Sequence, residues 1–376
     1  MSVRKRTWTT RLGEEKEAWI VAYSVFDGET YNRHIKTFDK KKDADAYHDS
    51  VRVDVREGRH TAPSKSPTVR EAAEQWIKRV AAEGRERATV LFYRQHLDLH
   101  ILPRLGKLKL ASLTPKRVEA FRDDLLANLS RPMARKVLTS FKSMLRSAKY
   151  RHVAADVTIA ASKRERKLEV GVDIPATGEI KRLIEAAKDG KWRTLLLTAA
   201  LTGLRASELR GLRWKDVDLK AEELHVRQRA DRYCAIGAPK SAAGTRSIPL
   251  APEVLAALKE WKLACPKAEA DLVFPTGTGR VYNHRNLLRG LESAMRKAHV
   301  VTKDGTPKYA MHAFRHFFAS WCINRKVDGG RELPAKVVQQ LLGHSSIVMT
   351  LDRYGHLFPR GDDRAELAKA SAALLA

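Results

Sequence analysis

Two stretches with the character of linkers interrupt this chain of 376 residues and limit how it can fold. Residues 61–67 contain two prolines and two serines, which is typical of a linker. Residues 152–173 contain a run of Lys, Arg and Glu at 163–167 and offer few apolar anchors to a core. Because each domain buries its own apolar residues, these interruptions predict three separately folded parts. The three parts are residues 1–60, 68–151 and 174–376.

The chain carries a large positive charge that is unevenly distributed. It holds 71 Lys and Arg residues against 44 Asp and Glu residues, a net charge of +27. Such an excess favours polyanions, because each neutralised phosphate releases counterions. Residues 61–170 hold 24 basic and 11 acidic residues, a net +13, whereas residues 1–60 carry +2 and residues 171–376 carry +12. We expect the middle part to be the main binding region for a polyanion. The alternative is that its basic residues form an ordinary solvated helical surface.

Several functional classes are disfavoured. No apolar run approaches the roughly 20 residues of a membrane-spanning helix, so we expect no membrane partner. The first residues carry charges without an apolar stretch behind them, so they are not a secretory signal. Cys234, Cys265 and Cys322 lack metal-binding spacing and leave an odd thiol, which suits a reducing cytoplasm.

Residues 1–60 are predicted to form a small β-rich module. Apolar side chains alternate along residues 19–25, as in a strand with one buried face. A turn at Asp27-Gly28 and a second alternating run over residues 31–37 complete a hairpin. A helix is expected to follow, because apolar residues recur at helical spacing over residues 44–55.

Residues 68–151 are predicted to be entirely helical. Thr68 and Glu71 have the spacing of a capping box. Thr114-Pro115 gives an N-cap followed by proline at the first helical position. Residues 174–376 are also mainly helical, with a small β-sheet insertion formed by Glu223 to Arg229 and Arg246 to Leu250.

The carboxy-terminal half contains four short segments with side chains suited to chemistry. In the first, Gly203 ends an apolar helix and Arg205 lies near the start of the next, where backbone amides also favour an anion. Glu208 is placed to support that guanidinium. In the second, Lys240 lies on a turn between the two strands, where it is suited to deliver a proton; Arg232 and Arg246 are nearby alternatives.

The third segment, Met-His-Ala-Phe-Arg-His, places His312 within one helical turn of Arg315 and His316. Two histidines at this spacing also suit a metal, but no glutamate or cysteine completes a site, so we expect none. The fourth segment places His344 at a glycine-marked turn and Tyr354 near the end of the next helix. Each of these residues alone also fits an ordinary structural role.

Together the four segments have what phosphodiester chemistry needs. Two arginines can hold the non-bridging oxygens of a phosphate by charge-assisted bonds. A tyrosine is a poor nucleophile at neutral pH, because its pKa is near 10, unless cations stabilise the developing charge. Histidines and a lysine supply proton transfer. Arginines would take the place of a metal, so no cofactor is expected.

The order Arg, Lys, His-x-x-Arg, His, Tyr, with Leu-Leu-Gly-His before the tyrosine, resembles the tyrosine recombinase (phage integrase) family. The resemblance covers roughly residues 175–360 and implies a role for each matching residue. Arg205 and Arg315 would clamp the phosphate, and Tyr354 would be the nucleophile. Lys240 would be the general acid for the leaving 5′ oxygen, His312 a base or proton shuttle, and His344 a hydrogen-bond donor to the transition state. Phe314 and a long connection from Asn324 to Pro334 depart from the family pattern.

The resemblance implies a multidomain α+β fold: an arm-type DNA-binding module, an all-α core-binding (SAM-like) domain and a mainly α catalytic domain. It further implies a recombinase of a phage or other mobile element in a bacterial cytoplasm, acting on nucleoid DNA. Its partners would be double-stranded DNA with core and arm-type sites, three further copies of the chain in a tetramer, a DNA-bending protein and an excisionase. The tail from Arg364 to Ala376 would dock on a neighbouring copy or pack on its own domain. Alternatives are a type IB topoisomerase and a non-catalytic DNA-binding protein.

Overall fold

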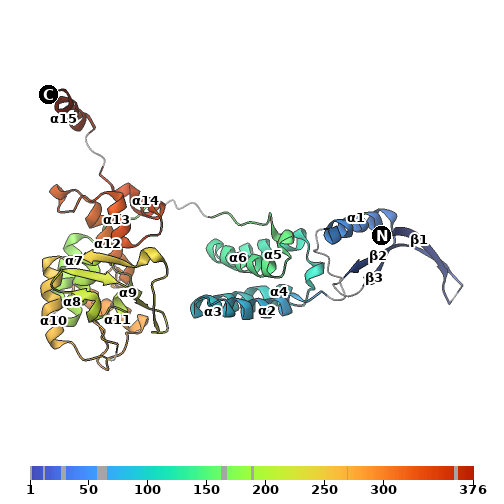
Figure 1. Ribbon diagram of the computed structural model, residues 1–376, viewed down its shortest axis with the longest axis horizontal. Helices are drawn as coiled ribbons and strands as arrows, with labels where there is room; N and C mark the ends of the chain where they lie inside the picture. Colours follow the sequence, from blue (N-terminus) through green and yellow to red (C-terminus); the bar gives the residue numbers. More distant parts are fainter. Residues whose placement is uncertain are drawn as a thin grey trace. The chain divides into compact units, whose positions relative to one another are not determined.

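The computed structural model describes most of the chain (Figure 1), namely residues 2–11, 13–26, 31–56, 66–161, 167–187, 190–268, 270–359 and 363–376. The chain forms two compact units, Met1–Lys163 and Arg164–Ala376. The described elements are mostly helices with three small sheets, which confirms the predicted α+β class. The finer division into three domains stays a prediction.

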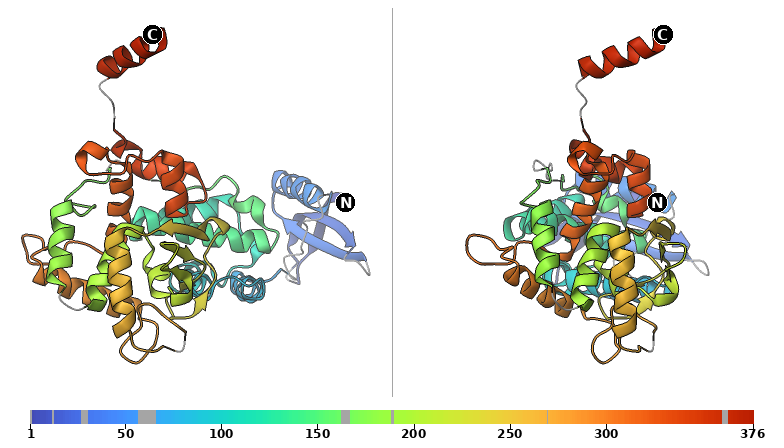
Figure 2. Two further views of the ribbon diagram at one scale, coloured as in Figure 1. Left: turned by 60° about the vertical axis from the view of Figure 1, so that its left-hand side comes forward. Right: turned by 90° about the vertical axis from the view of Figure 1, so that its left-hand side faces the viewer.

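The first unit begins with an antiparallel sheet of order β1-β2-β3. Its strands are β1 (Ser2–Thr9), β2 (Glu15–Phe26) and β3 (Tyr31–Phe38), and α1 (Lys41–Arg56) covers one face (Figure 2). Val21 and Tyr23 of β2 pack there against α1. The predicted hairpin strands β2 and β3 pair with Trp19 opposite Phe38, whereas the predicted turn at Asp27-Gly28 lies outside the described residues. Strand β1 is not predicted from the sequence, because it is an exposed edge strand without alternating apolar residues.

The helical segment that follows has its own hydrophobic core. Its helices are α2 (Val69–Ala82), α3 (Arg87–His96), a π-helical turn (Leu97–Ile101), α4 (Leu102–Leu105), α5 (Pro115–Asn128) and α6 (Arg131–Ser147). The predicted capping box starts α2, where Thr68 and Glu71 exchange side-chain and backbone hydrogen bonds. Thr114 caps α5 ahead of Pro115. The core continues past the expected boundary, since Val157 and Ile159 are buried in it; their irregular spacing gave no helical or strand signal.

The second unit contains nine described helices and a small sheet (Figure 1). The helices are α7 (Thr177–Ala186), α8 (Gly190–Thr202), α9 (Ala206–Arg210), α10 (Pro252–Ala264), α11 (His284–Lys297), α12 (Met311–Ile323), α13 (Ala335–Leu342), α14 (Ile347–Tyr354) and α15 (Asp363–Leu375). Strands β4 (Val217–Asp218), β5 (Glu223–Val226) and β8 (Arg246–Pro249) form the predicted insertion, beside a short ribbon of β6 (Arg229–Ala230) and β7 (Ile236–Gly237). None of the helices in the described ranges is long and apolar enough to cross a membrane.

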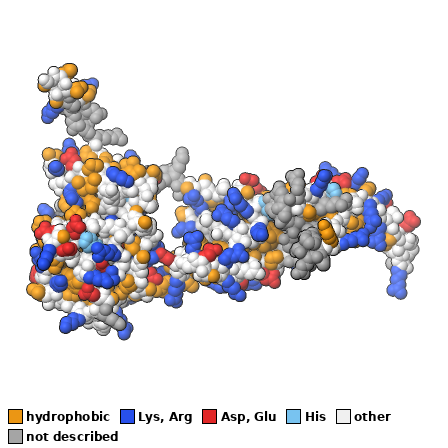
Figure 3. Space-filling model, in the orientation of Figure 1, with side chains coloured by type: hydrophobic (Ala, Val, Ile, Leu, Met, Phe, Trp, Pro, Cys, Tyr) orange, Lys and Arg blue, Asp and Glu red, His pale blue; other side chains and the backbone are white. Residues whose placement is uncertain are grey.

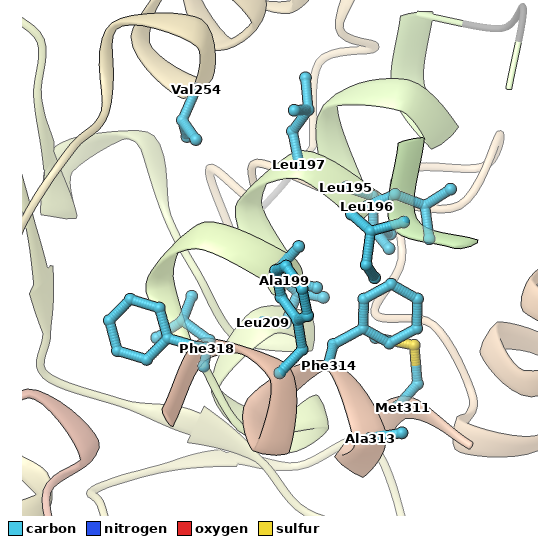
Figure 4. Packing of buried hydrophobic residues seen from close by; sticks show 14 of the residues in the cluster. Leu195, Leu196, Leu197, Ala199, Leu209, Val254, Met311, Ala313, Phe314 and Phe318 are labelled. Carbon is cyan, nitrogen blue, oxygen red and sulfur yellow. The ribbon is translucent and has the colours of Figure 1, made fainter. Parts of the chain in front are cut away.

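Helix α8 lies in the centre of this unit. Its residues from Thr194 to Ala200 are buried on every side, and α7, α10 and α12 pack against it. Figure 4 shows Phe314 of α12 close to Leu196 of α8, and Phe318 on the side of Ala199 and Leu209. Phe314, which departs from the family pattern, is 1% exposed and fills this core.

The long connection after α12 is compact. It turns at a 3-10 helix (Lys326–Asp328) and at Gly329, and then returns along the end of α12. The backbone N–H groups of Arg331 and Leu333 donate there to the carbonyls of Trp321 and Cys322. The added length therefore satisfies its own backbone groups and leaves the helices on either side in place.

Candidate active site

Five of the six predicted site residues lie at or near helix ends in the second unit. Arg205 is the N-cap of α9, and His312 and Arg315 are in the first turns of α12. His344 lies between α13 and α14, and Tyr354 is the last residue of α14. Helix ends expose unpaired backbone groups, so charged side chains find partners there.

Gly203 determines how α8 meets α12. It adopts a left-handed backbone (φ +62°) directly after α8, and a Cβ at this position would overlap the ring of Phe318. Only glycine meets both demands without strain. The close approach brings the Gly203 carbonyl to Arg315, whose Nη1 donates to it at 2.8 Å.

Three arginines from three different elements bind consecutive carbonyls at the end of α13. Arg246 Nε donates to Leu341 O at 2.7 Å, Arg315 Nη2 donates to Leu342 O, and Arg205 Nη2 donates to Gly343 O at 3.1 Å. The carbonyls of a helix end carry partial negative charge, which cations stabilise. Gly343 is left-handed (φ +65°) and turns the chain there. This gives a physical reason for the Leu-Leu-Gly-His sequence.

A buried carboxylate joins two of these arginines. Glu208 is 3% exposed; it accepts from Arg205 Nη1 at 2.6 Å and from Arg246 Nη2 at 2.9 Å. Burial alone would raise the pKa of Glu208, but the charges and hydrogen bonds of Arg246 and Arg205 outweigh it and lower the pKa. The carboxylate therefore stays ionised and fixes both guanidinium groups.

Arg315 is the most deeply buried charge of the cluster. It is 1% exposed, and burial, followed by the neighbouring charge of Arg205, lowers its pKa to about 9. The guanidinium is therefore still charged at neutral pH. A guanidinium has five N–H donors, so the bonds to Gly203 and Leu342 leave others for an anion.

His344 is held by the helix that it precedes. Its Nδ1 lies 2.9 Å from Thr350 Oγ1 of α14, and its ring stacks on that of Tyr354 with 6.4 Å between centroids and 6° between planes. Burial, followed by the charges of Arg315, Arg205 and Arg246, lowers the pKa of His344 to about 4. The imidazole is therefore neutral at pH 7.

Tyr354 is almost fully buried, with 1% of its surface exposed. Its Oη lies 2.8 Å from Nδ1 of His316, one turn after His312 on α12. The rings of His316 and Tyr354 meet edge to face. The phenol is therefore held against α12 from one side and covered by His344 on the other.

Among the six predicted site residues, His312 and Lys240 are the two that are exposed. His312 is exposed, yet neighbouring atoms crowd its ring; this desolvation, followed by the charges of Arg315 and Arg205, lowers its pKa. Lys240 is exposed in the loop between β7 and β8. That loop reaches the cluster, because a Cβ on Gly343 would lie 2.8 Å from Ala243 O.

Two members of the cluster were not among the predicted site residues. Arg246 was considered only as an alternative to Lys240, but its donors bind Glu208, Leu341 and Gly244 inside the protein. His316 was considered only as a possible metal ligand. Its spacing of four residues from His312 predicts that the two histidines lie on the same face of a helix. That spacing does not predict the contact between His316 and Tyr354.

The arrangement suits a transferable phosphate. Arg205, with a third of its side chain exposed, and the buried Arg315 are neighbouring positive charges, and Arg315 also interacts electrostatically with Tyr354. Charges fixed in advance around a reacting atom are the largest source of rate enhancement in many enzymes. The second unit therefore brings together guanidinium groups that can bind an anion, a tyrosine hydroxyl and several side chains that can carry protons.

Two family models match the chain. The model described as "Phage integrase family" matches residues 176–360, and the one described as "Phage integrase, N-terminal SAM-like domain" matches residues 68–126. Together they span well over half of the chain.

Known proteins similar to this chain agree with the models. A tyrosine recombinase XerC-like protein of Caldanaerobacter subterraneus subsp. tengcongensis is 26% identical over 352 residues, which are 85% of this chain and 87% of that protein. The fold is similar to the Tn1549 transposon integrase in complex with circular intermediate DNA, with TM-score 0.60, 22% identity, and coverage of 81% of this chain and 99% of that one. It is also similar to a lambda integrase tetramer bound to a Holliday junction, with TM-score 0.56, 17% identity, and coverage of 90% and 95%.

Proposed function

This chain belongs to the phage integrase family of tyrosine recombinases, and we propose that Tyr354 is the nucleophile with which it cuts and rejoins DNA. It is a site-specific DNA recombinase of a phage or other mobile element. The observation that carries the assignment of Tyr354 is its hydroxyl, held within a cluster of Arg205, Arg315, His316 and His344.

The proposed step exchanges one phosphate ester for another. Tyr354 gives up its hydroxyl proton to a basic group of the site, its Oη bonds to the phosphorus of the scissile phosphate, and the bond from phosphorus to the 5′ oxygen breaks. Lys240 gives a proton to that oxygen, which leaves as a hydroxyl. The 3′-phosphotyrosyl link keeps the ester bond energy, so a 5′ hydroxyl of the partner strand can reverse the step.

Arg205 and Arg315 hold the non-bridging oxygens in this scheme. Their positions are fixed by Glu208 and by the end of α13, so little reorganisation is needed as charge develops. His344, neutral at pH 7, donates a hydrogen bond to the same oxygens through the nitrogen that Thr350 does not take. His312, on the open side, relays protons to solvent.

The DNA is held by further parts of the chain. Basic side chains are spread over the visible face of the helical segment (Figure 3). Arg135 and Arg146 of α6 line a cleft of the same segment. We assign core-site binding to this segment and arm-type binding to the β1-β2-β3 module. Strand exchange needs two duplexes and four copies of the chain, as in the lambda integrase tetramer on a Holliday junction. We place the reaction on nucleoid DNA in a bacterial cytoplasm, with a DNA-bending protein and an excisionase as accessory partners.

The test is capture of the covalent intermediate. Duplexes cut from DNA flanking the gene, nicked so that the short cleaved product diffuses away, should trap wild-type protein in an adduct that survives denaturation. The Tyr354→Phe variant should give no adduct. Tyr309→Phe is the matched control, because Tyr309 is another buried tyrosine of the same unit, whose hydroxyl donates to Glu179.

Two outcomes would contradict the proposal. An adduct formed by Tyr354→Phe would place the nucleophile elsewhere. Rapid relaxation of a plasmid that lacks any recombination site would indicate a type IB topoisomerase instead.

A further inference from the structure

His316 has no role in the steps above, although it is in contact with the proposed nucleophile. It is 8% exposed, and its Nδ1 lies 2.8 Å from Tyr354 Oη. Tyr354, which carries this hydroxyl, is 1% exposed. A buried hydroxyl needs a hydrogen-bond partner, and the partner also determines where its proton can go.

The direction of this hydrogen bond follows from the two groups. A phenol is a better donor than acceptor, and a neutral imidazole has one N–H and one bare nitrogen. With its proton on Nε2, His316 presents a bare Nδ1 to the phenol. Groups near the pair include the rings of His344 and His312 and the cation Arg315, which in turn neighbours Arg205.

The neighbouring histidines are less well placed for the same task. His344 uses Nδ1 for Thr350 and turns the face of its ring to Tyr354. His312 meets His316 edge to face, 4.7 Å between centroids, and is exposed. His316 is thus the histidine whose nitrogen is aimed at the hydroxyl, and His312 is the next ring toward solvent.

We propose that His316 is a catalytic residue that accepts the proton of Tyr354 during cleavage. As Tyr354 Oη bonds to phosphorus, its O–H bond breaks and the proton passes to His316 Nδ1. Lys240 loses one proton to the 5′ oxygen in the same step, so the enzyme keeps its total charge apart from the bound phosphate. In rejoining, His316 returns the proton to the departing phenolate. The proposal rests on Tyr354 being the nucleophile.

The test separates the proton that leaves Tyr354 from the proton that reaches the DNA. Single-turnover adduct formation is measured for the full-length wild type, His316→Asn and Lys240→Ala. Asparagine places a hydrogen-bonding oxygen near the position of Nδ1 but cannot take up a proton. Each protein receives the ordinary substrate and one with sulfur in place of the 5′ bridging oxygen, whose thiolate leaves without protonation.

His316→Asn should form adduct about 10²- to 10⁴-fold more slowly on both substrates, the usual range for loss of a general base. Lys240→Ala should be slow only on the oxygen substrate. DNA binding and melting temperature of His316→Asn should match wild type. Adduct formation by His316→Asn within about threefold of wild type would overturn the proposal, as would rescue of its defect by sulfur.

A measurement on wild-type protein decides the matter if His316→Asn does not fold. Nitrogen NMR of histidine-labelled protein, with His316 assigned by comparison with Tyr354→Phe, should show a bare Nδ1 and a protonated Nε2 at neutral pH. A proton on Nδ1 would overturn the proposal. In either case, adduct formation by wild type and its loss in Tyr354→Phe test the nucleophile separately.

Discussion

Each arginine of the cluster is fixed by protein groups before any substrate arrives. Arg205 and Arg246 share Glu208, and Arg315 binds the carbonyls of Gly203 and Leu342. Long flexible side chains lose rotamer freedom when they are ordered, and here folding supplies that order. The cluster can therefore stabilise charge on a substrate without first rearranging.

His344 should make the stability of the second unit sensitive to acid. Its folded-state pKa of about 4 is below the usual value near 6.5, so the unfolded chain binds more protons between these pH values. Stability contributed by neutral His344 is fully present above pH 6.5 and is lost as the pH falls toward 4. The loss should be at most about 3 kcal/mol.

Unfolding curves at pH values from 7 to 4 measure this effect. His344→Asn should flatten the dependence, because asparagine does not titrate and can still bond Thr350. His299→Asn is the control, since His299 is exposed and left-handed, a conformation that asparagine adopts readily. Equal pH dependence in wild type and His344→Asn would contradict the prediction.

At this scale the sequence predicts residue types better than their partners. The six candidates could be named because arginine, histidine and tyrosine side chains have few uses in such an order. The roles of Arg246 and His316 could not be derived, because they depend on contacts across 95 and 38 residues. Such contacts follow from the packing of α12, α13 and β8, which no local pattern specifies.

The turn between α13 and α14 should be sensitive to one methyl group. Gly343 is left-handed (φ +65°), and a Cβ there would lie 2.8 Å from Ala243 O and 3.0 Å from Arg246 Nη1. Gly343→Ala should therefore lower the free energy of unfolding by roughly 1–2 kcal/mol for the left-handed backbone and by about a further 1–3 kcal/mol for overpacking. Displacement of Arg246 should also slow adduct formation.

Gly305→Ala is the matched control for this element. Gly305 is also left-handed (φ +75°), but a Cβ there meets no atom within 4 Å. Chemical unfolding should show only the backbone cost for Gly305→Ala, with normal adduct formation. Equal losses of stability in the two variants would mean that the contact at Gly343 is unimportant.

Elements with local signals were predictable and the others were not. The capping box of α2, Pro115 at the start of α5 and the break at Gly203 each act within a few residues. Strand β1 depends on pairing with β2, and its own residues are mostly exposed and charged. Its place in the sheet is a tertiary effect.

The tail should act between molecules. Helix α15 has three leucines, Leu367, Leu374 and Leu375, that are 69%, 84% and 86% exposed. Deleting residues 364–376 should leave the melting temperature of the protein unchanged within about 1 °C, because little apolar surface is lost from its core. Tetramers on DNA, counted by sedimentation, should fall at least tenfold, because the exposed leucines of a helix can fill a groove on a partner.

A full-length variant with these three leucines changed to serine should behave like the deletion. A lower melting temperature with normal tetramer formation would show instead that the tail packs on its own domain.

At the scale of the whole molecule, the charge of +27 and the order of the segments predicted a DNA-binding protein of several parts. The sequence did not predict that the helical core would include Val157 and Ile159.

At the end of α13, the three arginines bind the main-chain oxygens of Leu341, Leu342 and Gly343, and no side chain of that stretch. Replacing Leu341 or Leu342 by another apolar residue leaves those oxygens where they are. Inserting or deleting a single residue in α13 just before this stretch would shift all three carbonyl oxygens out of register with the arginines that bind them. The residue types at positions 341 and 342 can therefore change much more freely than the length of this segment can.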